Sequence, residues 1–149
     1  MQRLAVISNP RSQRNRQGAL AAVKHVVDGH AHVCHEELSD FAELGAIIER
    51  SVADGVEVIA VNGGDGTVQA VLTELGRRDL NGSAPKLAVL AGGMTNVIAK
   101  DVGIDGPPEK GLRRLLVSLT SGSQACAAAT RPLIGLALRP DEPPVYGMF

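Results

Sequence analysis

The chain has 149 residues, of which 44% are hydrophobic and only 2% are aromatic. This length and composition suit one globular domain with an aliphatic core, and they exclude a disordered chain. The formal net charge of −1 gives no support to a nucleic-acid-binding domain that works through overall positive charge.

The cysteines and the apolar runs predict the cellular setting. Cys34 and Cys126 are too few for a disulfide framework, which favours a reducing, cytoplasmic environment. No apolar run reaches the ~18 residues of a membrane span, and no basic amphipathic helix is evident. We therefore expect a cytoplasmic protein whose contact with the inner face of a membrane is transient. The apolar C-terminal end, Phe149 included, could also associate with a second copy of the chain.

The first half of the chain alternates apolar runs with helical patterns. A strand is predicted over 3–8, a helix over 13–28 and a weaker strand over 31–35. The capping box formed by Asp40 and Glu43 then predicts the start of another helix. The inward face of that helix is expected to consist of Phe41, Leu44, Ile48 and Val52.

The second half continues the alternation. Elements are predicted over 56–61 (strand), 67–77 (helix), 86–90 (strand), 95–101 (short helix), 109–120 (helix) and 133–138 (a fifth strand). Strands that alternate with helices predict an α/β fold with three layers: a mostly parallel, Rossmann-like sheet with helices on both faces. Such a sheet binds ligands at the carboxyl ends of its strands.

The C-terminal residues do not continue the alternation of strands and helices. Residues 139–144 are rich in proline and charge, and an apolar run begins again at Val145. This run could be a strand docked on the edge of the sheet, or it could open a second domain. We favour the second interpretation, with a nucleotide-binding domain over 1–138 and a linker plus the start of a missing domain over 139–149.

Three loops follow predicted strands, at 8–16, 62–67 and 91–96, and each leads into a predicted helix. The free N–H groups and the positive dipole end of a helix attract anions, and glycine lets a phosphate approach the main chain. The first loop adds Arg11, Arg14 and Arg16, which suit phosphate oxygens. Glycines in a simple strand-to-helix turn, and arginines in solvent, are the alternative interpretation of each loop taken alone.

Asp65 does not fit a simple anion site, because a carboxylate repels phosphate. It becomes useful if it holds Mg²⁺, binds a ribose hydroxyl or accepts a proton from the group that is phosphorylated. The loops together therefore favour phosphoryl transfer. The chain has neither a G-x-x-x-x-G-K-[ST] loop nor a G-x-G-x-x-G turn after its first strand, which argues against a usual P-loop and a dinucleotide dehydrogenase.

A histidine cluster lies between His25 and His35. On a strand, His30, His32 and Cys34 would share one face, an arrangement that could bind zinc. Because no paired Cys-x-x-Cys or other ligand spacing accompanies them, surface histidines on an edge strand are the favoured interpretation.

The three loops resemble the catalytic domain of the diacylglycerol kinase family. Asn9-Pro10-Arg11-Ser12-Gln13 is similar to the family's Asn-Pro-x-Ser-Gly loop, Gly63-Gly64-Asp65-Gly66-Thr67 matches its Gly-Gly-Asp-Gly-Thr loop, and 91–96 is similar to its Pro-x-Gly-Thr-x-Asn loop. This family includes bacterial lipid kinases and sphingosine kinases, and its fold is related to that of NAD kinases and phosphofructokinases.

The resemblance implies that ATP binds across the loops with Mg²⁺, and that a β-sandwich domain supplies the lipid site and further carboxylates. Asp65 would be the catalytic residue and would help hold Mg²⁺. The remaining residues expected at the nucleotide are Asn9, Pro10, Arg11, Ser12, Arg14, Asn62, Gly63, Gly64, Gly66, Thr67, Gly93, Thr95 and Asn96.

Several positions depart from the family pattern: Gln13, Gln69, Ala70, Ala91, Met94 and Val97. The middle loop is intact, so the resemblance predicts nucleotide binding more firmly than a particular lipid. The expected function is that of the nucleotide-binding domain of an ATP-dependent lipid kinase acting on a diacylglycerol-like hydroxyl. The alternatives are a kinase for a soluble substrate, such as an NAD kinase, and a non-catalytic nucleotide sensor.

Overall fold

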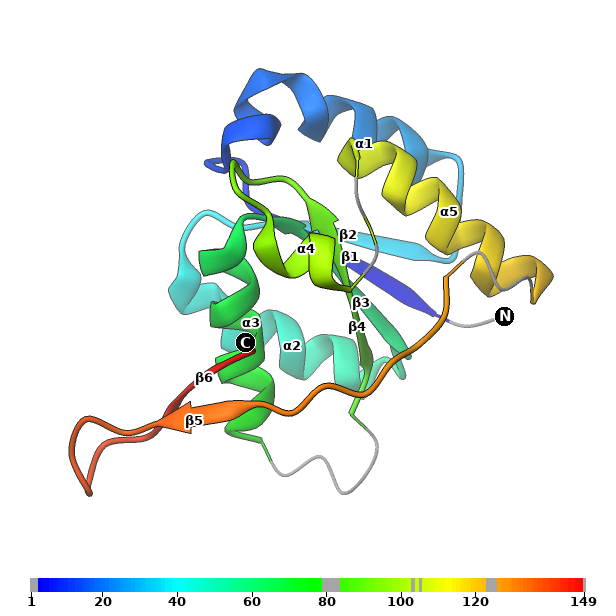
Figure 1. The fold of residues 1–149 in the computed structure, drawn as a ribbon. Coiled ribbons are helices and arrows are strands. Elements are labelled where there is room, and N and C mark those ends of the chain that lie inside the picture. Colours follow the sequence, from blue (N-terminus) through cyan, green and yellow to red (C-terminus); the bar gives the residue numbers. More distant parts are fainter. Residues whose placement is uncertain (1–2, 79–83, 103, 105, 123–125, 149) are drawn as a thin grey trace.

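The computed structural model describes residues 3–78, 84–102, 104, 106–122 and 126–148 (Figure 1). Its centre is a four-stranded, wholly parallel sheet. The strands are β1 (Leu4–Ser8), β2 (Val33–Glu37), β3 (Val58–Gly63) and β4 (Lys86–Ala91), in the spatial order β2-β1-β3-β4. The predicted α/β fold with a parallel sheet between two helical layers is confirmed.

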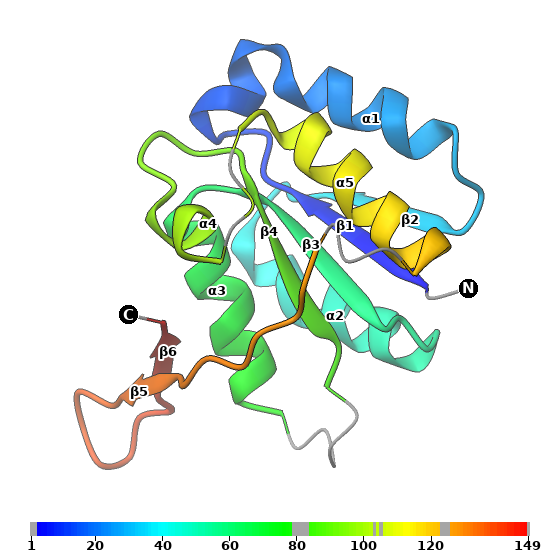
Figure 2. The same ribbon diagram turned by 45° about the vertical axis from the view of Figure 1, so that its right-hand side comes forward.

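Helices cover both faces of the sheet (Figure 2). On one face lie α1 (Leu20–Asp28) and α5 (Pro108–Ser121); on the other lie α2 (Leu44–Ala53), α3 (Asp65–Gly76) and α4 (Val97–Asp101). Alternate strand residues supply the two cores, as a period of two requires: Leu4 and Val6 pack toward α1 and α5, whereas Ala5 and Ile7 pack toward α2 and α3. Within the described ranges, no helix combines the length and apolar character needed to cross a membrane.

Several elements begin or end a few residues away from their predicted boundaries. The helix predicted over 13–28 contains the π-helical segment η1 (Asn15–Ala19), where Gly18 has φ 108°, before α1 begins at Leu20. The strand predicted over 31–35 lies at 33–37. Phe41 was expected to be buried but is 51% exposed, because it belongs to the 3₁₀ turn η2 (Phe41–Glu43), where the periodicity of the following α-helix does not apply.

The fifth strand predicted over 133–138 forms, but it does not join the main sheet. Only β5 (Ile134–Leu136) forms within 133–138, and it is exposed throughout. It pairs antiparallel with β6 (Val145–Gly147) in a separate two-stranded sheet. This hairpin is made with the next extended segment of the chain, so the backbone groups of β5 find partners without joining the main sheet.

Strand β6 docks on α3 rather than on the edge of the sheet. The Tyr146 amide donates to Thr73 Oγ1 (3.0 Å), and that hydroxyl donates to the Tyr146 carbonyl (3.3 Å). The Tyr146 ring lies against Gly76, and Met148 packs against the core between the sheet and α3. Phe149 lies outside the described residues. A second domain after residue 138 stays a prediction.

Gly76→Ala is expected to displace Tyr146 from α3. A Cβ at position 76 would lie 2.7 Å from Cδ2 and 2.8 Å from Cγ of the ring, which is too close for the ring to stay. Overpacking of this kind costs about 1–3 kcal/mol. Tyr146 is the only tyrosine and the chain has no tryptophan, so acrylamide quenching of the intrinsic fluorescence reports directly on this ring. Quenching should rise in Gly76→Ala and stay unchanged in Gly66→Ala, which adds its methyl group to open space on the same helix.

Candidate functional site

The three loops meet at the carboxyl edge of the sheet, beside the point where the strand order reverses. The connection from β1 leads to β2 on one side, whereas β3 lies on the other side of β1. Crevices at such a switch point are the usual ligand sites of open α/β sheets. Backbone hydrogen bonds join the loops: Asn9 N donates to Asn62 O (2.9 Å), Arg14 N to Gly92 O (3.0 Å), and Gly92 N to Gly63 O (3.1 Å).

Most of the loop glycines are needed for contact between the second and third loops. A Cβ on Gly93 would lie 2.5 Å from Gly64 Cα, and one on Gly92 would lie 2.9 Å from Gly63 N. A Cβ on Gly63 would meet Thr67 Cβ at 2.6 Å. Gly66 differs, because it is exposed and no atom lies within 4 Å of its added Cβ. Of the glycines predicted to face phosphate, Gly66 therefore has the most open space for a ligand, whereas Gly64 is half-buried and its added Cβ would lie 3.4 Å from Gly93 Cα.

Polar side chains tie the first loop to the second. Asn9 Nδ2 donates to Thr67 Oγ1 (2.9 Å), and Thr67 is only 3% exposed. Asn15 Nδ2 donates to the carbonyls of Asn9 (2.8 Å) and Asn62 (3.1 Å). Asn15 was not predicted from the sequence, where it is only one more polar residue among the arginines of the first loop. The Thr67 hydroxyl thus faces Asn9 inside the protein, and within the described part of the chain no side-chain hydrogen bond caps the N-terminus of α3.

Asp65 lies at the start of α3 and reaches across to the third loop. Its two carboxylate oxygens accept hydrogen bonds from the amides of Val97 (3.3 Å) and Ile98 (3.2 Å). The carboxylate therefore caps α4, where a negative charge also suits the helix dipole. This structural contact was not visible in the sequence, because it joins residues more than thirty positions apart.

Asn96 shapes the third loop from within. It is 2% exposed and adopts the left-handed conformation, with φ 52°. Its side chain accepts from Gly93 N and donates to Gly93 O, both at 2.8 Å. Beside it, Thr95 and Met94 are exposed, and Met94 is 77% exposed. Thr95 is thus the polar side chain of this loop that faces outward.

The arginines of the first loop take different positions. Arg14 Nη1 donates to the carbonyls of Ala91 (3.2 Å) and Gly106 (2.9 Å), so this side chain ties the first loop to the third. Arg11 and Arg16 are exposed, while Pro10 and Ser12 are half-buried in the turn after β1. Arg11 and Arg16 are therefore the cations of this loop that an incoming anion could meet.

The residues fit a magnesium ion that arrives with a ligand better than one held by protein alone. Among the described residues, no three His, Cys, Asp or Glu side chains come together as a metal site. Asp65 is a single carboxylate, and Mg²⁺ commonly takes one or two carboxylates together with substrate phosphates. The open N-terminus of α3 at Gly66 fits a phosphate group in the same way.

The histidine cluster does not form a zinc site within the described ranges. His30 and His32 precede β2 instead of lying on it, and their rings meet edge to face with centroids 5.7 Å apart. Cys34 is exposed. The expectation of surface histidines on an edge strand holds only in part: His25 is exposed, whereas His30, His32 and His35 are each half-buried. Of these, His35 is the one that lies on β2, and it is bonded to Ser8.

The chain is similar to one protein family and to several solved structures. The family model for the diacylglycerol kinase catalytic domain matches residues 3–127. Three solved structures from Bacillus anthracis str. Sterne, of proteins assigned as diacylglycerol kinases, share the fold, with TM-scores of 0.64–0.65 and 18–19% sequence identity. The alignments cover 76% of this chain but only 39–41% of those chains. No curated protein sequence matches. On the strength of the family match, this chain belongs to the diacylglycerol kinase catalytic domain family.

Proposed function

We propose that this chain is the nucleotide-binding domain of an ATP-dependent lipid kinase, which transfers the γ-phosphate of ATP to the hydroxyl of a diacylglycerol-like lipid. The observation that carries the proposal is the open N-terminus of α3. Gly66 leaves room for a ligand, no side chain among the described residues caps the helix, and Asp65 lies beside it. A phosphate group and its metal suit this combination of amide donors and one carboxylate.

The surrounding residues divide into two roles in this proposal. The outward-facing set would contact the nucleotide: the main chain at Gly64 and Gly66, with Arg11, Ser12 and Thr95. The buried set would hold the loops in place: Asn9, Arg14, Asn62, Gly63, Thr67, Gly93 and Asn96. Asp65 would serve as the protein ligand of the Mg²⁺ that accompanies ATP, and that Mg·ATP would supply the transferable phosphoryl group.

In this proposal, the lipid site belongs to a part of the protein outside this domain. The chain spans about two fifths of the length of the structures it resembles. We therefore expect the isolated chain to bind Mg·ATP weakly and to turn over little, because half of the cleft would come from elsewhere. Contact with the membrane would be transient and would accompany access to the lipid.

An acceptor assay on the full-length protein tests the proposal. The protein is given radiolabelled ATP, Mg²⁺ and, in separate reactions, diacylglycerol in mixed micelles, sphingosine in mixed micelles and NAD. Phosphorylation of diacylglycerol is the expected result. Transfer to NAD alone would replace the proposal with a soluble-substrate kinase. ATP binding by calorimetry without transfer to any acceptor would favour a nucleotide sensor, an alternative that the engagement of both Asp65 oxygens with α4 supports.

Gly66→Ala is expected to weaken ATP binding without harming the fold. The added methyl group meets no protein atom within 4 Å, and alanine in a helix is favoured over glycine by about 0.5–1 kcal/mol. A phosphate seated on this turn would collide with the same methyl group, so the Kd for Mg·ATP should rise at least roughly tenfold. Calorimetry and thermal melts measure the two effects. Unchanged affinity would mean that the nucleotide does not approach the main chain at Gly66.

A further inference from the structure

A layer of polar side chains replaces the apolar core at the carboxyl edge of one sheet face. Ser8 and Asn62 are each 0% exposed, although both are polar. They continue the alternation that places Val6 and Ala60 toward α1 and α5, and His35 pairs in register with Val6. Ser8, His35 and Asn62 therefore share one face of three neighbouring strands, directly beneath the first and second loops.

Hydrogen bonds join this layer to the candidate nucleotide site. Asn62 Nδ2 donates to Ser8 Oγ (3.0 Å), and Ser8 Oγ lies 2.8 Å from His35 Nε2. At the other end, the Asn62 carbonyl receives the amide of Asn9 and the side chain of Asn15. Asn9 in turn donates to Thr67 at the first turn of α3. The connection thus runs from edge strand β2 to the start of the helix at the candidate site.

The arrangement of these bonds favours a neutral His35. The Ser8 hydroxyl accepts from Asn62 Nδ2, so its own proton is available for His35 Nε2. When Nε2 accepts this proton, the ring is neutral and carries its own proton on Nδ1. A proton on Nε2 would point at Ser8 Oγ, and the Ser8 hydroxyl would lose its acceptor and have to turn.

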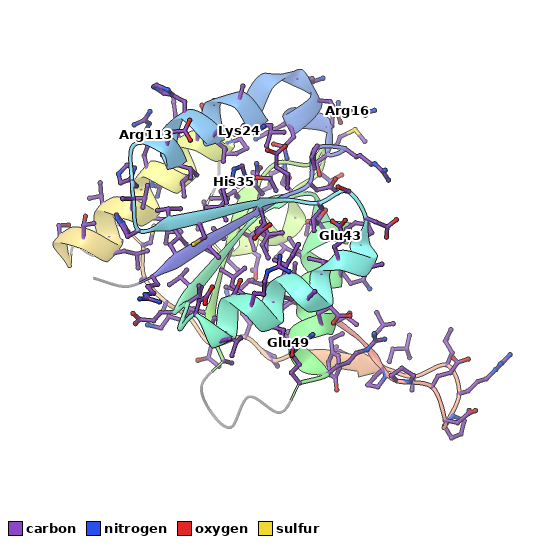
Figure 3. All side chains as sticks on the ribbon, turned by 180° about the vertical axis from the view of Figure 1, so that it is seen from behind. Arg16, Lys24, His35, Glu43, Glu49 and Arg113 are labelled. Atoms are coloured by element: carbon purple, nitrogen blue, oxygen red, sulfur yellow. The ribbon has the colours of Figure 1, made fainter. Side chains whose placement is uncertain are left out.

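The surroundings of His35 come from α1 and β2 (Figure 3). Burial lowers the pKa of His35, Glu37 raises it, Lys24 lowers it, and Asp28 and Glu36 raise it, with a net lowering below the usual value of 6.5. Lys24 and Glu37 also form an ion pair at 2.6 Å. Because the unfolded chain binds the proton more readily, the stability contributed by neutral His35 is complete above about pH 6.5 and is lost as the pH falls toward the folded pKa.

We propose that His35 is a positioning residue for the nucleotide site, whose neutral ring holds Ser8 and Asn62 so that the first two loops keep their geometry, and whose protonation loosens those loops. The link to nucleotide affinity rests on the proposed function. His35 itself lies on the edge strand and is bonded to Ser8 at the end of β1, so its effect on the loops passes through Ser8, Asn62 and Asn9.

An affinity profile against pH tests the effect on the site. The Kd for Mg·ATP is measured between about pH 7.5 and pH 5.5. The ratio of the Kd at the lower pH to the Kd at the higher pH is then compared between variants, because the titration of ATP itself contributes equally to all of them. The wild-type ratio should exceed that of His35→Gln by roughly fivefold, since glutamine can accept from Ser8 and does not titrate. His35→Leu should bind weakly at every pH. His25→Gln, which replaces an exposed histidine of α1, should keep the wild-type ratio. Equal ratios in wild type and His35→Gln would overturn the inference.

A second measurement needs no nucleotide. The backbone amide NMR signals of Asn9, Asn62 and Thr67 should shift with the same pH midpoint as the His35 ring in the wild type and in His25→Gln, but not in His35→Gln. If these amide signals do not shift as the His35 ring titrates, the positioning role is overturned. If these amides follow His35 but no variant binds ATP, the proposed function fails while the positioning role stands, so the two failures can be distinguished.

Discussion

Gly93→Ala should lower the free energy of unfolding by about 2–3 kcal/mol and abolish measurable binding of Mg·ATP. The added Cβ would lie 2.5 Å from Gly64 Cα and 3.1 Å from Asn96 Oδ1. Neither neighbour can move cheaply, because one is main chain and the other is the side chain that holds the third loop in shape. The second and third loops would have to separate, and the candidate site lies on both.

Urea unfolding followed by circular dichroism measures the stability, and calorimetry measures the binding. Gly66→Ala is the matched control, since it makes the same substitution in the neighbouring loop without meeting a protein atom. The control should be as stable as the wild type or slightly more so, although it too should bind ATP less tightly. Equal stability of Gly93→Ala and Gly66→Ala would mean that the close contact of the two loops does not stabilise the fold.

The strands and the longer helices could be predicted because burial leaves a local pattern. Strand β3 is fully buried, and its apolar run identified it to within two residues. Helix α3 buries Val68, Val71 and Leu72, and their spacing of three and four is the pattern that predicts a helix over 67–77. The end of β3 was missed because Asn62 and Gly63 still pair with Leu90 and Ala91, although neither side chain is apolar.

The pairing of the fifth strand shows what such patterns cannot predict. The run from 133 to 138 is as apolar as β4, but its pairing depends on a partner elsewhere in the chain and not on its own composition. Its residues form an exposed hairpin with β6. The prediction that Phe41 is buried was wrong for a local reason. The 3₁₀ turn rotates its side chain away from the face that Leu44 and Ile48 bury.

The candidate site, too, has features that the sequence could predict and features that it could not. The sequence predicted which loops come together, because the carboxyl ends of parallel strands share one edge. It could not show that Gly92 and Gly93 serve the contact between two loops whereas Gly66 faces open space. It also could not show the bonds from Asp65 to α4 or from His35 to Ser8, which join residues distant in the chain. These contacts depend on the register of the sheet.

The two roles of Asp65 lead to opposite expectations for its variants. As the cap of α4, the residue contributes hydrogen-bond acceptors, which asparagine can partly supply. As the partner of a magnesium ion and a developing phosphoryl transfer, it contributes a negative charge, which asparagine lacks. Asp65→Asn should therefore stay within about 1 kcal/mol of the wild-type stability, while Asp65→Ala should lose about 1–2 kcal/mol.

Turnover by the full-length protein should fall roughly a hundredfold or more in both variants, because both remove the charge. Thermal melts and the diacylglycerol phosphorylation assay, carried out on the same preparations, separate the two roles. If activity instead follows stability, with Asp65→Asn nearly as active as the wild type, then Asp65 only supports the third loop.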